Sequence, residues 1–152
     1  MNERARILVI DDDDSIRKVL SSILEEKGYE ADTAKDGEEA IKKARIKFYN
    51  LALIDIRLPD MEGTELLTRL RQTTPKMVKI ILTGYPSLDN AIEAVNMGAD
   101  GYLIKPVNMD VLHEKITKHL KKQKESMKYS EDKVAQFIET RVKQLGHTTR
   151  SR

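Results

Sequence analysis

Short apolar runs alternate with helical patterns along most of the chain. Five runs have the continuous apolar or alternating character of β-strands, at residues 7–10, 29–34, 51–54, 78–82 and 101–104. Between them, apolar residues recur every three or four positions, as in helices that bury one face. Alternating strands and helices of these lengths predict an α/β protein whose parallel strands are joined by right-handed helical crossovers.

The character of each run predicts its place in the sheet. Residues 7–10 and 51–54 are wholly apolar, as expected of central strands covered on both faces, whereas residues 29–34 alternate as an edge strand does. This pattern fits a flavodoxin-like (βα)5 doubly wound parallel sheet with strand order 2-1-3-4-5. Ligands of such sheets bind outside the carboxyl ends of the strands.

Each predicted helix carries apolar residues that are expected to face the sheet. They are Ile16, Val19, Leu20, Ile23 and Leu24 in the first helix, Ala40, Ile41 and Ala44 in the second, Leu66, Leu67 and Leu70 in the third, Ala91, Ile92 and Val95 in the fourth, and Val111, Leu112, Ile116 and Leu120 in the fifth. Gly28 and Gly98 predict left-handed caps after the first and fourth helices, and Asn108 predicts a cap before the fifth.

The pattern changes near residue 121, which predicts one domain at residues 1–122. Residues 123–146 are expected to form a linker and an amphipathic helical extension, with a new helix capped by Ser130 and ending before Gly146. Its apolar face carries Val134, Phe137, Ile138, Val142 and Leu145. That face must pack on the domain, pair with another copy or await a partner. Residues 147–152 are expected to be a disordered tail.

Composition narrows the class of protein. The 152 residues and 39% hydrophobic content suit one domain with a core, and the absence of Cys excludes disulfides and suits a cytoplasmic location. No apolar run approaches the length of a membrane span. The net charge of +2 combines −4 over residues 1–112 with +6 over residues 113–152. A solvated basic helix is the preferred interpretation of this tail, over attraction to nucleic acid, membrane or an acidic partner.

Reactive side chains follow the ends of four predicted strands. Asp11 and Asp12 follow the first strand, Asp55 the third, Thr83 the fourth and Lys105 the fifth. In the predicted strand order these ends share one edge, so three carboxylates, a hydroxyl and an ammonium group can converge. Crowded carboxylates repel one another unless a cation is present, and oxygen ligands with open positions suit Mg²⁺. A carboxylate beside Mg²⁺ can attack a phosphoryl group, which predicts phosphoryl transfer to aspartate.

Each of these residues has a structural interpretation as well. The aspartates at 11–14 could cap the first helix, and at least one of Asp13 and Asp14 is expected to do only that. Asp55, Thr83 and Lys105, taken singly, are most simply a loop carboxylate, a strand-end hydroxyl and a surface charge. Their joint placement at one edge is what favours a functional site.

Four segments resemble response-regulator receiver domains, over roughly residues 5–122. They are I-L-V-I-D-D-D-D-S-I-R (7–17), L-A-L-I-D-I-R-L-P-D-M-E-G (51–63), I-I-L-T-G-Y (80–85) and G-A-D-G-Y-L-I-K-P (98–106). The resemblance implies that Asp55 is the phospho-acceptor and that Asp11 and Asp12 position Mg²⁺, together with Asp55 and the backbone carbonyl of Arg57. It also implies that Thr83 and Lys105 contact the phosphoryl group.

The same resemblance implies a switch and its regulation. Tyr102 would move together with Thr83 on phosphorylation, and the Lys105–Pro106 peptide bond would be cis. Arg57 and Tyr85 occupy positions that tune dephosphorylation, and because neither can orient an attacking water, slow autodephosphorylation is expected. The implied partners are a sensor histidine kinase or phosphotransfer protein, a downstream protein, and a second copy through helix four, strand five and helix five or through the tail helix.

The tail is too short for an effector domain with its own core, which predicts a stand-alone receiver without direct nucleic-acid binding or membrane association. The enzyme alternative is a haloacid-dehalogenase-like phosphatase with Asp11 as nucleophile and Asp13 as general acid. It leaves Asp55 unexplained and lacks the later acids that such an enzyme needs. A nucleic-acid-binding tail would contain only Tyr129 and Phe137 as aromatics, and a flavin phosphate would be repelled by four aspartates.

Overall fold

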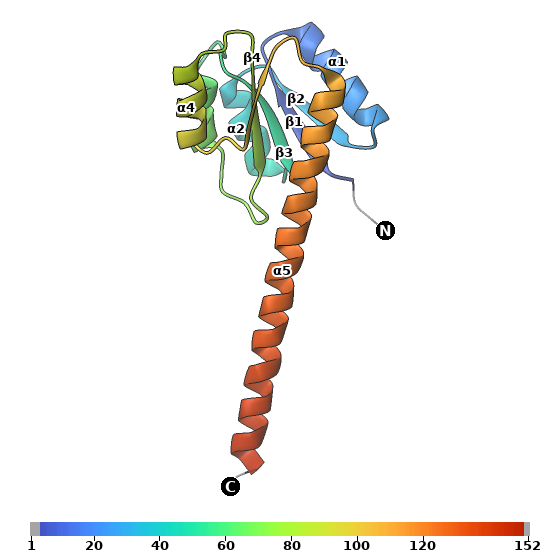
Figure 1. Cartoon of the computed structure of the whole chain (residues 1–152), viewed down its shortest axis with the longest axis vertical. Helices are drawn as coiled ribbons and strands as arrows, with labels where there is room; N and C mark the ends of the chain where they lie inside the picture. Colours follow the sequence, from blue (N-terminus) through green and yellow to red (C-terminus); the bar gives the residue numbers. More distant parts are fainter. Residues whose placement is uncertain (1–3, 151–152) are drawn as a thin grey trace.

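The computed structural model describes residues 4–150, the last four of them by their backbone alone. In this part of the chain five strands alternate with five helices (Figure 1). The elements are β1 (Arg6–Ile10), α1 (Asp14–Glu26), β2 (Glu30–Ala34), α2 (Gly37–Ile46), β3 (Leu51–Asp55), α3 (Gly63–Arg69), β4 (Val78–Thr83), α4 (Leu88–Asn96), β5 (Gly101–Ile104) and α5 (Met109–Arg150). All strand pairs are parallel and their order is β2-β1-β3-β4-β5, which confirms the predicted fold.

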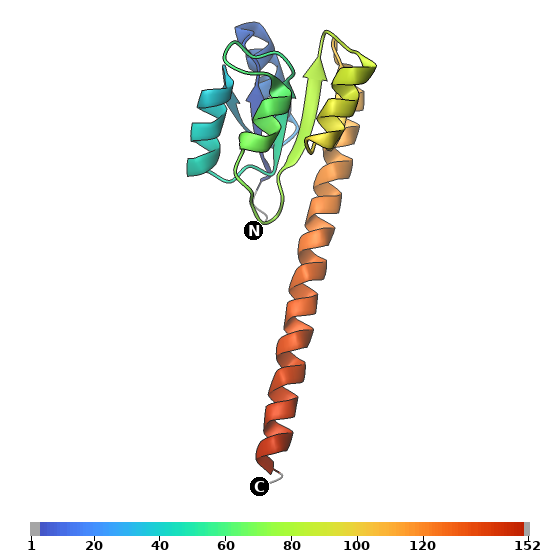
Figure 2. The same ribbon diagram turned by 90° about the vertical axis from the view of Figure 1, so that its left-hand side faces the viewer.

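Helices cover both faces of the sheet (Figures 1 and 2). Side chains from α2, α3 and α4 pack on one face, around residues such as Leu8 and Ile54, while α1 and α5 cover the other, around residues such as Val9 and Leu53. Neighbouring strand residues thus point into different cores, and residues 7–10 of β1 and 51–54 of β3 are all apolar because both faces of these strands are buried. The residues that α5 adds to the core, Leu112 and Ile116, lie near the start of this helix.

The predicted caps of α1 and α5 and the predicted glycines after α1 and α4 are confirmed. Asp13 caps α1, its carboxylate accepting hydrogen bonds from the backbone N–H groups of Ser15 and Ile16. Asn108 likewise accepts from two N–H groups at the start of α5. Gly28 and Gly98 have φ of 95° and 101°, a left-handed conformation that strains other residues.

Some predicted core residues are on the surface instead. The exposed fractions are 56% for Val19, 50% for Ile92, 65% for Val95 and 41% for Val111, so these assignments were wrong. The reason is geometric in α4, which lies beside the edge strand β5. An edge strand covers less of a helix than a sheet centre does, and Ala94 is the buried residue of that helix.

The tail is a single helix and not a linker followed by a second helix. α5 continues from Met109 to Arg150, so Ser130 is not an N-cap, Gly146 does not end the helix, and residues 147–150 are helical rather than disordered. Residues 151–152 lie outside the described residues. Ser in a helix interior costs only tenths of a kcal/mol (about 0.5) relative to Ala, which is too little to break a helix rich in Lys, Glu and Gln. Figures 1 and 2 show the helix projecting from the domain as a rod.

The helix α5 still contacts the domain at Gln123, just past the predicted domain boundary at residue 122. The Gln123 side-chain amide donates to the backbone carbonyls of Asn50 (2.9 Å) and Lys76 (2.8 Å) and accepts from the Asn50 side chain (3.1 Å). These bonds tie α5 to the starts of β3 and β4. No helix in the described part of the chain is long and apolar enough to cross a membrane.

Candidate functional site

The sheet brings the predicted reactive residues to one edge. Asp11 follows β1, Asp55 and Thr83 end β3 and β4, and Lys105 follows β5. The register pairs Asp55 with the residue before Thr83, which places all four strand ends at one level. Carboxylate oxygens of Asp11, Asp12 and Asp55 lie within 4.8 Å of one another. The predicted convergence of three carboxylates is therefore present.

Lys105 is the counter-ion of this cluster. Its Nζ lies 2.7 Å from Asp11 Oδ2 and 3.5 Å from Asp55 Oδ2. Asp11 is almost fully buried and is further held by the N–H of Asp13 (2.9 Å), while Arg17 donates to the Asp11 carbonyl (2.7 Å). The lysine thus bridges the two buried acids, with the shorter contact to Asp11.

These contacts leave the site with a partly compensated negative charge. Burial raises the pKa of the Asp55 carboxyl, and the negative charge of Asp11 raises it further, against the opposing effect of Lys105. Burial alone would lower the pKa of Lys105, but the hydrogen bond and charge of Asp11 outweigh it, so that this pKa is raised. Asp55 is therefore a destabilised anion in a site where additional positive charge would be favourable.

Replacing Asp55 by Asn is expected to stabilise the metal-free protein by about 1 kcal/mol at neutral pH, the usual size for a single stabilising substitution. The raised pKa means that ionised Asp55 costs stability above that pKa and costs none below its unfolded-state pKa. The gain should vanish in acid and grow as pH rises through the raised pKa. Urea unfolding in EDTA at several pH values measures it.

Asp32 provides a control, because its pKa is shifted in the opposite direction to that of Asp55. Burial would raise its pKa, but the hydrogen bond from Tyr49 (2.6 Å) and the charge of Lys47 outweigh burial and lower it. Ionised Asp32 therefore adds stability above its unfolded-state pKa, and this contribution is lost as pH falls through the folded-state value. Asp32→Asn should destabilise the protein at neutral pH. Equal stability of wild type and Asp55→Asn at every pH would contradict the electrostatic account.

Thr83 and Tyr102 lie behind the cluster. Thr83 is fully buried, its Oγ1 accepts from the N–H of Tyr85 (2.9 Å), and its carbonyl accepts from the N–H of Lys105 (2.7 Å). The half-buried Tyr102 has a buried hydroxyl that finds no hydrogen-bond partner among the described residues. A buried polar group without a partner costs free energy. A movement of the ring that brings the hydroxyl to a partner or to solvent would remove this cost. The Lys105–Pro106 peptide bond is cis, as the resemblance implied.

Arg57 and Tyr85 touch each other across the mouth of the site. The Arg57 guanidinium carbon lies 4.1 Å from the centre of the Tyr85 ring, within the range of a cation–π contact. Arg57 belongs to the loop after β3 and its N–H donates to Asp55 Oδ1 (3.3 Å), while Tyr85 belongs to the loop after β4. The stack joins the two loops that flank Asp55.

Sequence reasoning missed Gly63, which supports the acceptor from behind. A Cβ at Gly63 would lie 2.4 Å from the carbonyl oxygen of Asp55 and 2.9 Å from Cα of Ile56. The Gly63 N–H donates to the carbonyl of Ile56 at 2.7 Å, so the start of α3 is held against the end of β3. The sequence signals it in two ways: Gly63 is the last residue of the 51–63 segment, and it stands near the start of a predicted helix, where a glycine is usually not required.

Asp60, in the same loop, has a structural role. Its carboxylate accepts from the N–H groups of Gly37 and Glu38, both at 2.9 Å, and so caps α2 from another loop. Asp13 is likewise committed to capping α1. Because its carboxylate is already occupied by these two hydrogen bonds, Asp13 is poorly placed to act as the general acid of a phosphatase.

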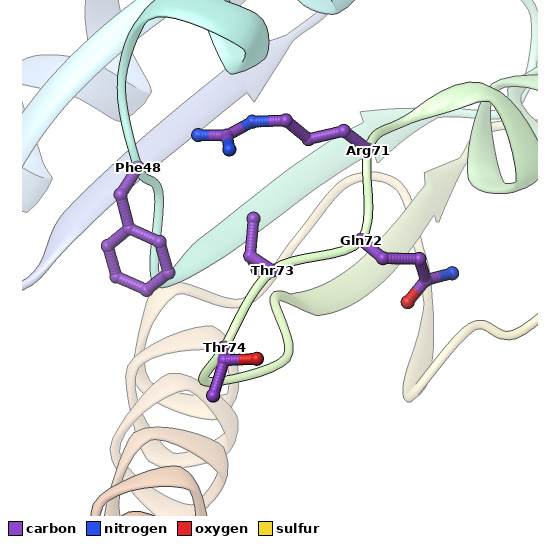
Figure 3. A pocket seen from close by; sticks show the side chains of 5 residues that line it. All are labelled: Phe48, Arg71, Gln72, Thr73 and Thr74. Carbon is purple, nitrogen blue, oxygen red and sulfur yellow. The ribbon is translucent and has the colours of Figure 1, made fainter.

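A surface hollow at the amino end of the sheet is not part of this site (Figure 3). It is lined by Phe48, Arg71, Gln72, Thr73 and Thr74, from the loops before β3 and β4. The side chain of Arg71 extends across it, and its Nε donates to the carbonyl of Ala44 at 2.6 Å. The hollow thus contains a hydrogen bond between α2 and the loop before β4. It lies at the opposite end of the strands from Asp55.

Most of the chain matches one known protein family. Residues 7–117 match the family described as response regulator receiver domain. The transcriptional regulatory protein ZraR of Klebsiella oxytoca is 41% identical over 110 residues, which are 72% of this chain and 25% of that protein. The chain thus spans about a quarter of the length of this curated relative.

Two solved structures show the same similarity. A CheY-like response regulator receiver domain protein from Methanospirillum hungatei JF-1 is 47% identical, with a TM-score of 0.78 over 82% of this chain and 99% of that one. A response regulator from Burkholderia pseudomallei, solved with a phosphorylated aspartic acid, a calcium ion and citrate, is 34% identical, with a TM-score of 0.67 over 71% and 64% of the two chains. The chain belongs to the response regulator receiver domains of two-component signalling, as the sequence motifs implied.

Proposed function

We propose that this domain is switched by transfer of a phosphoryl group to Asp55. The observation that carries the proposal is the cluster of Asp11, Asp12 and Asp55 with Lys105 at the carboxyl edge of the sheet. An Asp55 carboxylate oxygen attacks phosphorus, the bond from phosphorus to the donor breaks, and the donor leaves with the bonding electron pair. The phosphorylated aspartic acid of the Burkholderia pseudomallei relative supports this assignment.

The acidic cluster suits Mg²⁺. Three carboxylate oxygens within 4.8 Å, one of them on the exposed Asp12, offer hard oxygen ligands beside open solvent. Asp11, Asp12 and Asp55 would hold the ion, together with the carbonyl of Arg57. When bound, Mg²⁺ neutralises the carboxylates and the phosphoryl oxygens.

The chain's own residues orient and stabilise the transferred group. Lys105 reaches both buried acids and can turn from Asp11 to a phosphoryl oxygen, because its side chain keeps 20% of its surface in solvent. Thr83 can offer its hydroxyl to the same group from the neighbouring strand. The Arg57–Tyr85 stack carries no carboxylate or amide that could orient an attacking water, which supports a long-lived phosphoryl group.

The donor we propose is a sensor histidine kinase or a phosphotransfer protein, in the cytoplasm. An apolar groove beside the site supports a protein donor. It runs between α1 and the β5–α5 loop, where Val19, Leu20 and Val107 line it together with the stem of Lys105. Val19 is exposed there, which accounts for an apolar residue that the core does not use.

Intact-protein mass after incubation with acetyl phosphate and Mg²⁺ tests the proposal. Wild type should gain one phosphoryl group only with Mg²⁺ and keep it for minutes or longer, Asp55→Ala should gain none, and Asp11→Ala should gain it slowly. Val19→Asp should slow transfer from a phosphorylated phosphotransfer protein but not from acetyl phosphate. Phosphorylation of Asp55→Ala but not of Asp11→Ala would support the phosphatase alternative, and decay within seconds would contradict the role of the stack.

The output we propose is a change at Tyr102 and the face formed by α4, β5 and α5. The exposed apolar residues of this face include Val95 (65%), Ile104 (56%) and Val111 (41%), which suits a downstream protein or a second copy. A shift of Thr83 toward the phosphoryl group would free space for Tyr102, whose hydroxyl lacks a partner. NMR shift changes should spread on phosphorylation from Thr83 to Tyr102 and Ile104. Changes confined to the loops around Asp55 would contradict this output.

A further inference from the structure

The part of α5 that leaves the domain carries a continuous apolar stripe. Its exposed fractions are 57% at Val134, 66% at Phe137, 55% at Ile138 and 62% at Val142. Residues 127, 134 and 141 form one row with a spacing of seven, and residues 131, 138 and 145 form a second row four positions further along. Two such rows are the a and d positions of a coiled coil, and Phe137 and Val142 lie beside the rows at flanking positions. The stripe continues the helix face that packs Leu112 and Ile116 into the core.

Only two positions of these rows are charged, and they have opposite signs. They are Glu131 in one row and Arg141 in the other. A parallel pair of helices places each row against its own copy, so that Glu131 faces Glu131 and Arg141 faces Arg141. Like charges in the seam of a coiled coil oppose association. A parallel pair in register is therefore disfavoured by the charges of this sequence.

An antiparallel pair removes both conflicts. If the two-fold axis passes beside residue 136, Glu131 lies opposite Arg141 of a second copy, in two symmetric layers. The same register places Val134 opposite Ile138 of the second copy, and Met127 opposite its Leu145. Every layer is then apolar or an ion pair of opposite charges. A single register that satisfies all six layers is a specific form of charge and size complementarity.

We propose that residues 127–145 of two copies associate as an antiparallel helix pair. The two segments overlap over about 27 Å at 1.5 Å per residue. Glu139 and Lys143 form an ion pair with each other (3.3 Å), about half a turn away from the stripe, and stay in solvent in this arrangement. The tail leaves the domain at the end opposite Asp55 (Figure 1), so the pair leaves the phosphorylation site accessible and does not depend on it.

Sedimentation of the full chain over a wide range of concentrations tests association. Wild type should pass reversibly from monomer to dimer, and Ile138→Asp should weaken dimerisation at least about tenfold. Lys143→Ala, on the opposite face, is the matched control and should leave it unchanged. All three proteins should be phosphorylated equally on Asp55, which shows that the domain is folded. A wild type that stays monomeric at every concentration overturns the proposal.

Charge reversal tests the direction of the helices. Glu131→Arg and Arg141→Glu should each weaken the dimer about tenfold, because each creates two layers of like charge, and the double variant should restore it. In a parallel pair each single change only exchanges one like-charge layer for another, so that the singles would dimerise as wild type does. That second result overturns the antiparallel register.

Crosslinking provides an independent readout, since the natural chain has no Cys. A mixture of Val134→Cys and Ile138→Cys should give the mixed disulfide under mild oxidation, because these positions face each other across the pair. Each variant alone should crosslink poorly. Efficient disulfide formation by each variant with itself would show a parallel pair and overturn the proposal.

Discussion

Replacing Gly63 by alanine is expected to destabilise the protein by about 3 kcal/mol, at the upper end of the usual range for overpacking. The added Cβ would lie 2.4 Å from the carbonyl oxygen of Asp55 and 2.9 Å from Cα of Ile56, and both contacts are backbone atoms that cannot rotate away. Relief requires α3 to move from the end of β3, which stretches the 2.7 Å hydrogen bond from the Gly63 N–H to the Ile56 carbonyl. Urea unfolding measures the loss.

The same displacement should slow phosphorylation, because the clashing carbonyl belongs to the acceptor residue itself. Gly84→Ala is the matched control for stability, since it lies in the neighbouring loop and a Cβ there meets nothing within 4 Å. It should leave the free energy of unfolding nearly unchanged or raise it by about 0.5 kcal/mol, because alanine reduces the conformational entropy of the unfolded chain. A Gly63→Ala protein as stable as Gly84→Ala would show that α3 can shift without cost.

The strands and their order could be predicted because the evidence for them is local. An apolar run such as residues 51–54 marks a strand buried on two faces, and the alternation in residues 29–34 marks an edge. Once the order is known, topology alone brings the residues after the strands together. The convergence of Asp11, Asp55 and Lys105 was therefore predictable without any knowledge of side-chain positions.

What could not be predicted depends on distances between segments that are remote in sequence. The sequence alone assigns Gln123 to a linker, but in the structure it binds backbone carbonyls of the loops that precede β3 and β4. Lys79 interrupts the apolar strand β4, yet it is buried because its Nζ donates to the carbonyl of Leu67 in α3. A sequence pattern reports which face of an element is apolar, but it does not report which neighbour satisfies a polar group on that face.

Some predictions of helix ends and of buried helix faces were wrong for a related reason. Ser130 followed by two acids is a good start signal, but a start signal has no effect inside a helix that already continues through it. Ile92 and Val95 have helical spacing, but the edge of the sheet leaves them uncovered. Apolar positions that the core does not use are more informative for function here than those it buries, since they mark the α4–β5–α5 face and the tail stripe.

The finer arrangement of the site also escaped sequence reasoning. The motif places Lys105 at the acceptor, but in the structure its shorter contact is to Asp11, at 2.7 Å against 3.5 Å to Asp55. The stacking of Arg57 on Tyr85 joins two positions that the sequence could only treat separately. Both features follow from side-chain rotamers, which depend on all neighbours at once.

Replacing Lys105 by methionine is expected to lower the rate of phosphorylation by acetyl phosphate roughly 100-fold, the usual loss when one stabilising donor is removed from such a site. Met keeps the apolar stem that lines the groove beside α1 but supplies no charge. The phosphoryl oxygens would lose a partner, and the carboxylates of Asp11 and Asp55 would lose the only ion-pair partner that they have among the described residues. Intact mass followed over time in Mg²⁺ buffer measures the rate.

The pH dependence separates the charge of Lys105 from its packing. Without the ammonium group the pKa of Asp55 should rise further, because burial and Asp11 then act without compensation. A larger fraction of Asp55 would be protonated and unable to attack, so the defect should shrink as pH is raised. Lys47→Met is the matched control, since that lysine is exposed and pairs only with Asp32 at the far edge strand. A Lys105→Met defect that is the same at every pH would mean that Lys105 acts on the phosphoryl group alone and does not control the ionisation of Asp55.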